Sequence, residues 1–363
     1  MDERIYQIAL SLLNGIGPIK AKNLVCYTGS AQAVFKESEK NLGKIEGIGW
    51  YVSKGLGRSE ALARAERELA YIEKNNIQLY YYKDPNYPSG LKPVEDGPIV
   101  LFCKGNINFN LKNIAVVGTR KSTPYGKKMT DKFVTDLAPM GVQIVSGLAH
   151  GIDKAAHEAA LDNSLPTIGV LGHGLDTMYP AAHRGLAESM LAQGGLMTEF
   201  VSGTPGDPKH FPRRNRIVAG LCEALVVIES SESGGSMITA NLANDYNRDV
   251  FAFPGNADRE SSKGCNNLIR RDKAHLITCA EDMVNIMGWE MKEKQDDLQT
   301  NLFVQMTEDE ERLVAIFREK GELDIDNLSF AASMTSSVLS LHLFNLEMKG
   351  MVKALPGKRY SLI

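Results

Sequence analysis

The sequence predicts an α/β protein built on a doubly wound, mostly parallel, Rossmann-like sheet. Apolar runs alternate with helical stretches from about 75 to 288, and glycines punctuate the turns after the runs. Strands this continuously apolar are buried on both faces, and alternating helices indicate parallel pairing. The expected strands are 114–117, 143–145, 167–171, 196–198, 224–228 and 250–253.

The composition is that of a globular protein in a reducing compartment. The 363 residues suggest two or three domains, and 43% hydrophobic with 23% charged residues is an ordinary balance. The five cysteines show no spacing typical of a zinc site. We expect no signal peptide and no membrane span, which favours a cytoplasmic location. The net charge of -3 means that any contact with nucleic acid needs a local basic patch.

Residues 1–72 are predicted to form a small helical domain of the helix-hairpin-helix or SAM-like type. Two similar glycine turns, at 14–18 and 46–50, each follow apolar residues and precede a helical stretch. Glycine permits the tight turn and presents backbone N–H groups that can hold a phosphate. A helical bundle whose glycines serve only the turns explains the pattern equally well, so DNA binding by this part stays open.

Residues 307–363 follow a solvated linker at 289–306 and are predicted to form a winged-helix domain. Thr307 and the acidic residues after it are typical of a helix start. Two further helices are expected, and then a hairpin at 351–362 with its turn at 356–357. Winged helices often bind DNA, but this segment has few late basic residues, so contact with protein or a regulatory role is favoured.

Ligands of a doubly wound sheet bind beyond the carboxyl ends of its strands, so the residues after each strand are candidates. A glycine turn with hydroxyl and basic groups at a helix N-terminus is expected to bind an anion. The fingerprint of dinucleotide binding is absent, so no cofactor is expected. The candidates after the first two strands are Gly118, Thr119, Arg120, Lys121, Ser146 and Gly147.

The segment after the fourth strand holds three arginines and an aromatic residue within six positions. Guanidinium groups clamp phosphates, and an aromatic face stacks on a base. Successive helical positions point in different directions, so only one or two of these arginines are expected to face phosphate. The candidates are Lys209, Phe211, Arg213, Arg214, Asn215 and Arg216. After the fifth strand, another helix start that can bind a phosphate is formed by Gly234, Gly235 and Ser236. Three anion-binding loops at one edge of the sheet are more than a mononucleotide needs, so an extended polyanion is the expected ligand.

Catalysis or metal binding at His150, Asp153 and His157 is the weaker interpretation of the segment after the second strand. Two histidines with six residues between them are not a usual zinc spacing, and Asp153 is placed to cap the helix 154–161. No catalytic residue and no metal site is therefore assigned.

Five motifs, taken in order, closely resemble the DNA-processing protein A (DprA, also called Smf) family over about residues 80–285. They are Val117-Gly118-Thr119-Arg120, the segment 146–153, the segment 211–216, Ser233-Gly234-Gly235-Ser236 and Phe253-Pro254-Gly255-Asn256. The resemblance implies that an extended Rossmann-like domain at 73–288 binds single-stranded DNA, forms a homodimer and passes the strand to the recombinase RecA during natural transformation.

The resemblance also implies roles for individual residues. Arg120 would grip a phosphate, Phe211 would line a base pocket, and Lys209 with the following arginines would form a basic wall. The dimer surface would lie around Leu268 and Ile269.

An enzyme is the alternative hypothesis. Nucleoside-monophosphate phosphoribohydrolases of the lysine-decarboxylase-like fold share the general sheet and a Gly-Gly phosphate loop, but the segment 233–240 lacks the catalytic glutamate of their motif. A transcription factor that reads duplex DNA through the C-terminal module comes third, because that module has few basic residues. The principal hypothesis is a non-enzymatic protein that binds single-stranded DNA.

Overall fold

A computed structural model describes residues 2–290, 307–349, 351–355 and 357–362 of the chain. Its contacts divide the chain into two compact units, Met1–Lys292 and Glu293–Ile363. Most of the expected linker, 291–306, lies outside the described residues. In the described part of the chain, no helix combines the length and the apolar character needed to cross a membrane.

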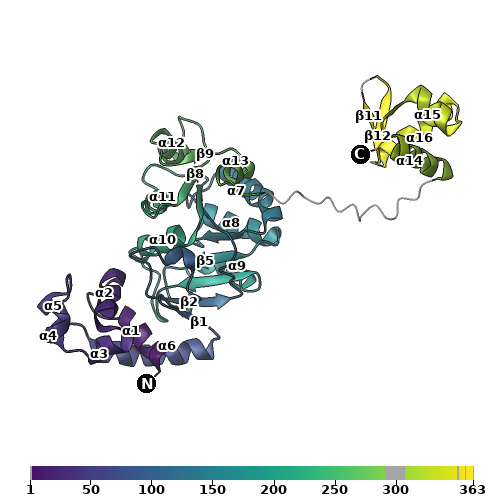
Figure 1. Ribbon diagram of the computed structural model, residues 1–363. Helices are drawn as coiled ribbons and strands as arrows, with labels where there is room; N and C mark the ends of the chain where they lie inside the picture. The colour runs from purple at the N-terminus through teal and green to yellow at the C-terminus, as the bar shows by residue number, and fades with distance from the viewer. Residues whose placement is uncertain (1, 291–306, 350, 356, 363) are drawn as a thin grey trace. The chain divides into compact units, whose positions relative to one another are not determined.

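The first unit is built around a nine-stranded sheet (Figure 1). Its strands are β1 Gln78–Tyr81, β2 Val100–Gly105, β3 Asn113–Val117, β4 Gln143–Ser146, β5 Thr167–Val170, β6 Gly194–Thr198, β7 Ala224–Val227, β8 Asp249–Ala252 and β9 His275–Leu276. Their order is β1-β2-β6-β5-β4-β3-β7-β8-β9. The seven strands that run from β6 to β9 in this spatial order are all parallel to their neighbours. β2 pairs antiparallel with β6, and β1 pairs antiparallel with β2 at the edge of the sheet. The predicted mostly parallel α/β sheet and its six strands, β3 to β8, are confirmed.

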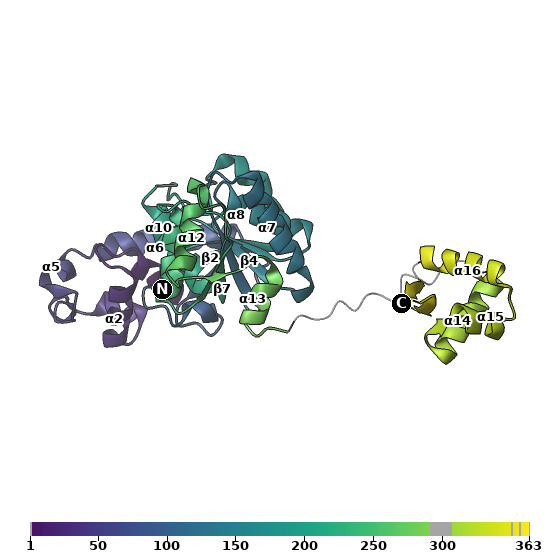
Figure 2. The same ribbon diagram turned by 90° about the horizontal axis from the view of Figure 1, so that it is seen from above.

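Helices cover both faces of this sheet. They are α7 Pro124–Asp136, α8 Ile152–Asp162, α9 Arg184–Met190, α10 His210–Leu221, α11 Gly235–Asp245, α12 Lys263–Arg270 and α13 Ala280–Ile286. Successive strand residues point to opposite faces, so Ile114 and Val116 pack with α7, α8 and α13, whereas Ala115 and Val117 pack with α10, α11 and α12. Figure 2 shows α7 and α8 on one side of the sheet and α10 and α12 on the other. Burial on both faces explains why the strands are continuously apolar.

The strand order reverses beside β3. The chain adds β4, β5 and β6 on one side of β3, returns along α10, and then adds β7, β8 and β9 on the other side. Loops that leave neighbouring strands in opposite directions open a crevice at the carboxyl ends of those strands. A ligand site is therefore expected between the ends of β3 and β7.

Six helices precede the sheet: α1 Glu3–Ser11, α2 Pro18–Thr28, α3 Ala31–Lys36, α4 Glu39–Leu42, α5 Gly49–Lys54 and α6 Arg58–Lys74. The glycine turns expected from the sequence lie between α1 and α2 and between α4 and α5, and Gly15 and Gly47 have φ values of 71° and 78°. The core of these helices continues into the sheet, because Ile8 and Leu24 share one apolar cluster with Phe102 of β2. The helices thus belong to the same compact unit as the sheet.

The second unit contains α14 Glu308–Lys320, β10 Leu323–Asp324, α15 Ile325–Ala332, α16 Ser336–Met348, β11 Val352–Leu355 and β12 Arg359–Leu362. Thr307 caps α14 as expected, since its hydroxyl accepts from the Glu310 amide and the Glu310 carboxylate accepts from the Thr307 amide. The three strands form an antiparallel sheet in the order β10-β12-β11. The expected hairpin is β11 with β12, although Pro356 of its turn lies outside the described residues.

Candidate nucleic-acid interface

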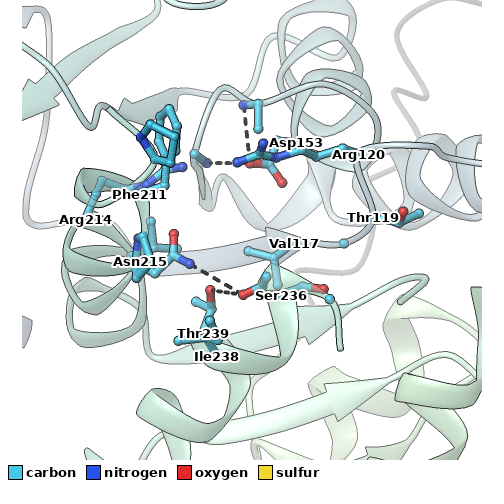
Figure 3. A pocket seen from close by; sticks show the side chains of 18 of the residues that line it. Val117, Thr119, Arg120, Asp153, Phe211, Arg214, Asn215, Ser236, Ile238 and Thr239 are labelled. Atoms are coloured by element: carbon cyan, nitrogen blue, oxygen red, sulfur yellow. Dashed lines mark hydrogen bonds between the residues drawn. The ribbon is translucent and has the colours of Figure 1, made fainter. Parts of the chain in front are cut away.

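A cleft of about 430 Å³ lies at the carboxyl ends of β3, β4 and β7, beside the reversal of the strand order (Figure 3). The loops after these strands form its walls, together with the first turns of α10 and α11. The fold therefore brings together residues that are far apart in the sequence. Predicted site residues that line the cleft are Gly118, Thr119, Arg120, Gly147, Phe211, Arg214, Asn215, Gly234, Gly235 and Ser236.

Arg120, Phe211 and Tyr179 form a cluster of one cation and two aromatic rings on the cleft wall. The guanidinium carbon of Arg120 lies 5.2 Å from the centre of the Phe211 ring. The Tyr179 ring is stacked on Phe211, with the centroids 5.7 Å apart and 28° between the planes. Tyr179 is 51% exposed and was not among the residues predicted from the sequence. The available signal was an aromatic residue in the loop after the third strand, at the same sheet edge.

Arg214 lies beneath the cleft and is buried, with 4% of its surface exposed. Its guanidinium donates to the carbonyl oxygen of Val170 at the end of β5. A Cβ atom on Gly147 would lie 2.1 Å from a guanidinium nitrogen, so the loop after β4 needs glycine where it crosses Arg214. Burial lowers the pKa of Arg214 to about 10, with Asp153 opposing and Arg120 adding to the shift. Arg214 remains a cation at neutral pH, and a desolvated cation favours an anion bound above it.

Asp153 holds the loop that crosses Arg214. Its Oδ2 accepts hydrogen bonds from the amides of Gly147, at 3.2 Å, and Ala149, at 3.3 Å. The prediction that Asp153 caps its helix is wrong, because Gly151 is the N-cap and α8 has no side-chain cap. Burial raises the pKa of Asp153, although Arg214 and these amides oppose that shift.

His157 is fully buried and is a structural residue. Its Nδ1 lies 2.7 Å from the Thr167 hydroxyl, and burial lowers the pKa of its imidazole to about 3, so the ring is neutral at physiological pH. No group of three or more His, Cys, Asp or Glu side chains in the described residues has the geometry to hold a metal ion.

Helix α11 begins at the cleft without a side-chain cap. Gly234 is its N-cap residue, and Gly235 and Ser236 open the first turn. The Asn215 side chain donates to the Gly235 carbonyl oxygen at 3.4 Å (Figure 3). The Ser236 hydroxyl donates to the Ser230 hydroxyl at 2.8 Å. Amide groups of a first helical turn have no partner within their helix and favour negative charge. This helix start can therefore receive an anion from the cleft.

The start of α7 is already occupied by a carboxylate of the protein. Glu229, which follows β7 and is 3% exposed, accepts from the amide and from the hydroxyl of Thr123, both at 2.9 Å. Thr123 is the N-cap of α7. The sequence predicted that this helix start would bind an external anion; instead Glu229 neutralises it. Arg120, in the loop before the helix, stays exposed to the cleft.

Glu229→Gln is expected to lower the free energy of unfolding by about 1–3 kcal/mol. The amide and hydroxyl of Thr123 each donate to one carboxylate oxygen of Glu229, whereas a glutamine side chain has a single acceptor oxygen. Urea unfolding followed by circular dichroism measures the change. Glu223→Gln is the matched control, since Glu223 is exposed near the start of β7 and should change stability by less than about 0.5 kcal/mol. Equal losses in the two variants would contradict the assigned role of Glu229.

Arg213 and Arg216 lie outside the cleft lining and bind Glu199 instead. The Arg213 guanidinium lies 3.1 Å from Glu199 Oε2 and 5.2 Å from the centre of the Phe200 ring. Arg216 is buried, pairs with the same carboxylate and donates to the carbonyl oxygen of Asp96. The geometry gives both side chains structural partners, and phosphate contact by either stays a prediction.

Three further predicted residues also lie outside the cleft lining. Ser146 is fully buried and donates its hydroxyl to the Val116 carbonyl oxygen at 2.6 Å, so its side chain faces the interior. Lys121 and Lys209 are exposed, directly after Arg120 and at the N-terminus of α10 respectively. Their backbone amides donate to Thr119 Oγ1 at 3.2 Å and to Asp207 Oδ1 at 2.8 Å respectively, and phosphate contact by their side chains stays a prediction.

The residues predicted at a dimer surface belong to the core of this unit. Leu268 is 2% exposed and lies in the apolar cluster beneath α12, and Ile269 packs partly buried against the same cluster. Burial of Leu268 within its own chain argues against its side chain at an interface. The dimer surface itself stays a prediction.

A family model described as DNA recombination-mediator protein A matches residues 78–288, the whole of the sheet and the cleft. The chain belongs to this family. Protein Smf of Synechocystis is 31% identical over 99% of this chain and 99% of its own length. The DNA processing protein DprA of Streptococcus pneumoniae is 42% identical over 55% of this chain and 71% of its own length.

Two solved structures from the family share the fold. The X-ray structure of DprA from Streptococcus pneumoniae matches with a TM-score of 0.65 and 31% identity, covering 80% of this chain and 99% of that one. DNA processing protein A from Helicobacter pylori, in a structure concerning its single-stranded DNA binding mode, matches with a TM-score of 0.53 and 28% identity, covering 59% and 97%. The family predicted from the five motifs is thus confirmed.

Proposed function

We propose that this chain is a single-stranded DNA-binding recombination mediator that acts in DNA processing during natural transformation. The observation that supports this proposal most directly is the composition of the cleft, which combines the exposed ring of Tyr179 and the half-buried ring of Phe211 with an exposed arginine, a buried arginine and an uncapped helix start. The Helicobacter pylori relative, whose structure concerns single-stranded DNA binding, supports the same ligand class.

The cleft chemistry separates bases from phosphates. Phe211 and Tyr179 offer ring faces on which unpaired bases stack, a contact worth about 1–3 kcal/mol per base. Arg120 and the amides of Gly235 and Ser236 are donors for phosphate oxygens. In a blunt duplex the bases are already paired and stacked on one another, so they cannot stack on the aromatic rings of the cleft. Single strands should therefore bind better than duplexes.

A titration of labelled oligonucleotides by fluorescence anisotropy tests this function. The single strand is expected to bind at least about tenfold tighter than the blunt duplex, because duplex DNA cannot use the ring faces. Affinity should fall steeply with salt, with a logarithmic slope of about -0.7 for each phosphate contacted. Equal affinity for both forms, or binding insensitive to salt, would overturn the proposal.

We propose that the protein works by binding and not by catalysis. Asp153 is the one carboxylate among the cleft-lining residues, and two backbone amides hold it in place. The phosphoribohydrolase hypothesis requires a free carboxylate beside the substrate sugar. Incubation with AMP should therefore release no adenine, and robust release would favour the enzyme.

The proposed mediator acts as a homodimer in the cytoplasm and passes its strand to the recombinase RecA. Two linked clefts on one strand would raise the apparent affinity, since the second contact becomes intramolecular. Light scattering measures the dimer, and a pull-down with purified RecA measures the handover contact. A strictly monomeric protein, or one that fails to retain RecA, would remove the corresponding part of the proposal.

We further propose that the N-terminal helices form a helix-hairpin-helix unit and that the second compact unit is a winged helix that contacts protein. Its third helix, α16, carries no Asp, Glu, Lys or Arg from 336 to 346. Its exposed residues include two large apolar side chains, Leu341 at 60% and Phe344 at 59% exposed, beside the hydroxyl groups of Ser336, Ser337 and Ser340. A groove-reading helix needs positive charge to contact the phosphates, and residues 336–346 carry no Lys or Arg. Sequence-specific duplex binding by the full chain would contradict this assignment.

A further inference from the structure

A second cleft, of about 340 Å³, lies at the same edge of the sheet as the first. It opens at the carboxyl ends of β7 and β8, whereas the first cleft opens at β4, β3 and β7. Neighbouring strands are about 4.8 Å apart, so β3 and β8 are separated by about 10 Å. The residues that line the second cleft are Tyr125, Glu229, Pro254, Gly255, Asn256, Arg259 and Ser262.

The walls of the second cleft are held in place by hydrogen bonds. The Tyr125 hydroxyl donates to the Pro254 carbonyl oxygen at 2.6 Å, which ties α7 to the loop after β8. The Asn266 side chain accepts from the Gly255 amide at 3.1 Å and donates to the Gly255 carbonyl oxygen at 2.9 Å. A Cβ atom on Gly255 would lie 2.2 Å from the Ser262 hydroxyl oxygen, so the loop packs closely. The cleft is therefore preformed.

The lining repeats the chemistry of the first cleft. Tyr125 is 38% exposed and offers an aromatic ring, Asn256 is an exposed amide, and Arg259 is an exposed guanidinium. Lys128 is exposed one turn further along the same face of α7. The lining carboxylate, Glu229, is held by Thr123 and is 3% exposed, so its charge is largely compensated. An aromatic ring beside a guanidinium and an amide fits one nucleotide.

We propose that the second cleft is a further nucleotide subsite for the same single strand that occupies the first. This inference rests on the proposed function. The loop 118–123 separates the two clefts, with Arg120 on the first and Tyr125, at the start of the following helix, on the second. Stacked nucleotides advance about 3.4 Å each along a strand, so about 10 Å corresponds to roughly three nucleotides. The strand would cross this loop, with one base on Phe211 and a later base on Tyr125.

Binding of oligothymidylates of two lengths to the full chain tests the second subsite. A strand of about 2 nucleotides is too short to reach from the first cleft to the second, whereas one of about 16 nucleotides spans both and lies within the range of known single-strand site sizes. Tyr125→Ala and Arg259→Ala should each weaken the long strand about fivefold to tenfold and leave the short strand within about twofold of wild type. Arg67→Ala, which removes an exposed arginine of α6, is the charge-matched control and should change neither affinity.

Arg120→Ala separates failure of the second subsite from failure of the proposed function. If Arg120→Ala weakens both strands but Tyr125→Ala and Arg259→Ala behave as wild type, the second subsite is refuted and the first cleft stands. Equal losses on both strand lengths with Tyr125→Ala would also refute a separate subsite. If Arg120→Ala has no effect on either strand, the proposed function fails at its main cleft.

Discussion

Replacing Arg120 and Phe211 together by alanine is expected to weaken single-stranded DNA binding by roughly a hundredfold to a thousandfold. Arg120 supplies an exposed guanidinium and Phe211 a ring face on the same wall of the cleft. A charge-assisted hydrogen bond contributes about 1.5–3 kcal/mol, and a stacked base about 1–3 kcal/mol. Because the two side chains contact one another, the losses of binding free energy in the two single variants should not sum to the loss in the double variant. Wild type, the two single variants and the double variant therefore form a double-mutant cycle. Fluorescence anisotropy at constant salt measures all four affinities of the cycle.

Arg213→Ala provides the matched control for this loss. Arg213 lies two positions after Phe211, carries the same charge as Arg120, and is exposed, but it pairs with Glu199 outside the cleft lining. Its removal should change the affinity by less than about threefold, since its guanidinium pairs with the buried carboxylate of Glu199 and does not line the cleft. A loss with Arg213→Ala as large as that with Arg120→Ala would show that the strand follows another path.

Arg214→Ala is expected to lower the free energy of unfolding by about 3–5 kcal/mol at neutral pH. The change removes the buried cation beside Asp153 and the donor to the Val170 carbonyl oxygen. Asp153 then remains buried without a cation beside it, and the loop at Gly147 loses the guanidinium group against which it packs. Urea unfolding measures the loss, and weaker DNA binding should accompany it.

Asp153→Asn should recover part of this stability in the double variant, because the uncompensated carboxylate is gone. The pH dependence has a defined sign. Burial already raises the pKa of Asp153, and loss of Arg214 raises it further, so the ionised form is the destabilised one. The deficit of Arg214→Ala is therefore largest above that pKa and shrinks as the pH falls through it. A deficit independent of both pH and Asp153 would contradict a charge-based role for Arg214.

The central strands were predictable because their burial leaves a local signal. The central positions of β3, β4 and β7 are apolar and pack on both faces against covering helices, so a short apolar run suffices to find these strands. The edge strands β1 and β2 were not predicted as individual strands. Their pairing is antiparallel and depends on β6, whose residues lie about 95 positions further along the chain than those of β2. In addition, β1 is buried at only its last position, so it lacks the continuous apolar run that marks the central strands.

Motifs, apolar runs and glycine turns are local properties, so the amino-acid sequence was sufficient to predict the family, the parallel sheet and the loops that could carry a site. Which side chains share the cleft depends instead on how the helices pack on the sheet. Arg214 faces it from below while Arg213 and Arg216 turn to Glu199, since the rotation of α10 is set by burying Ile217 and Val218 against the sheet. The same packing places Glu229 at the start of α7 and Tyr179 on Phe211. Such contacts join residues far apart in the chain, so their geometry depends on how the helices and strands pack and cannot be read from local sequence.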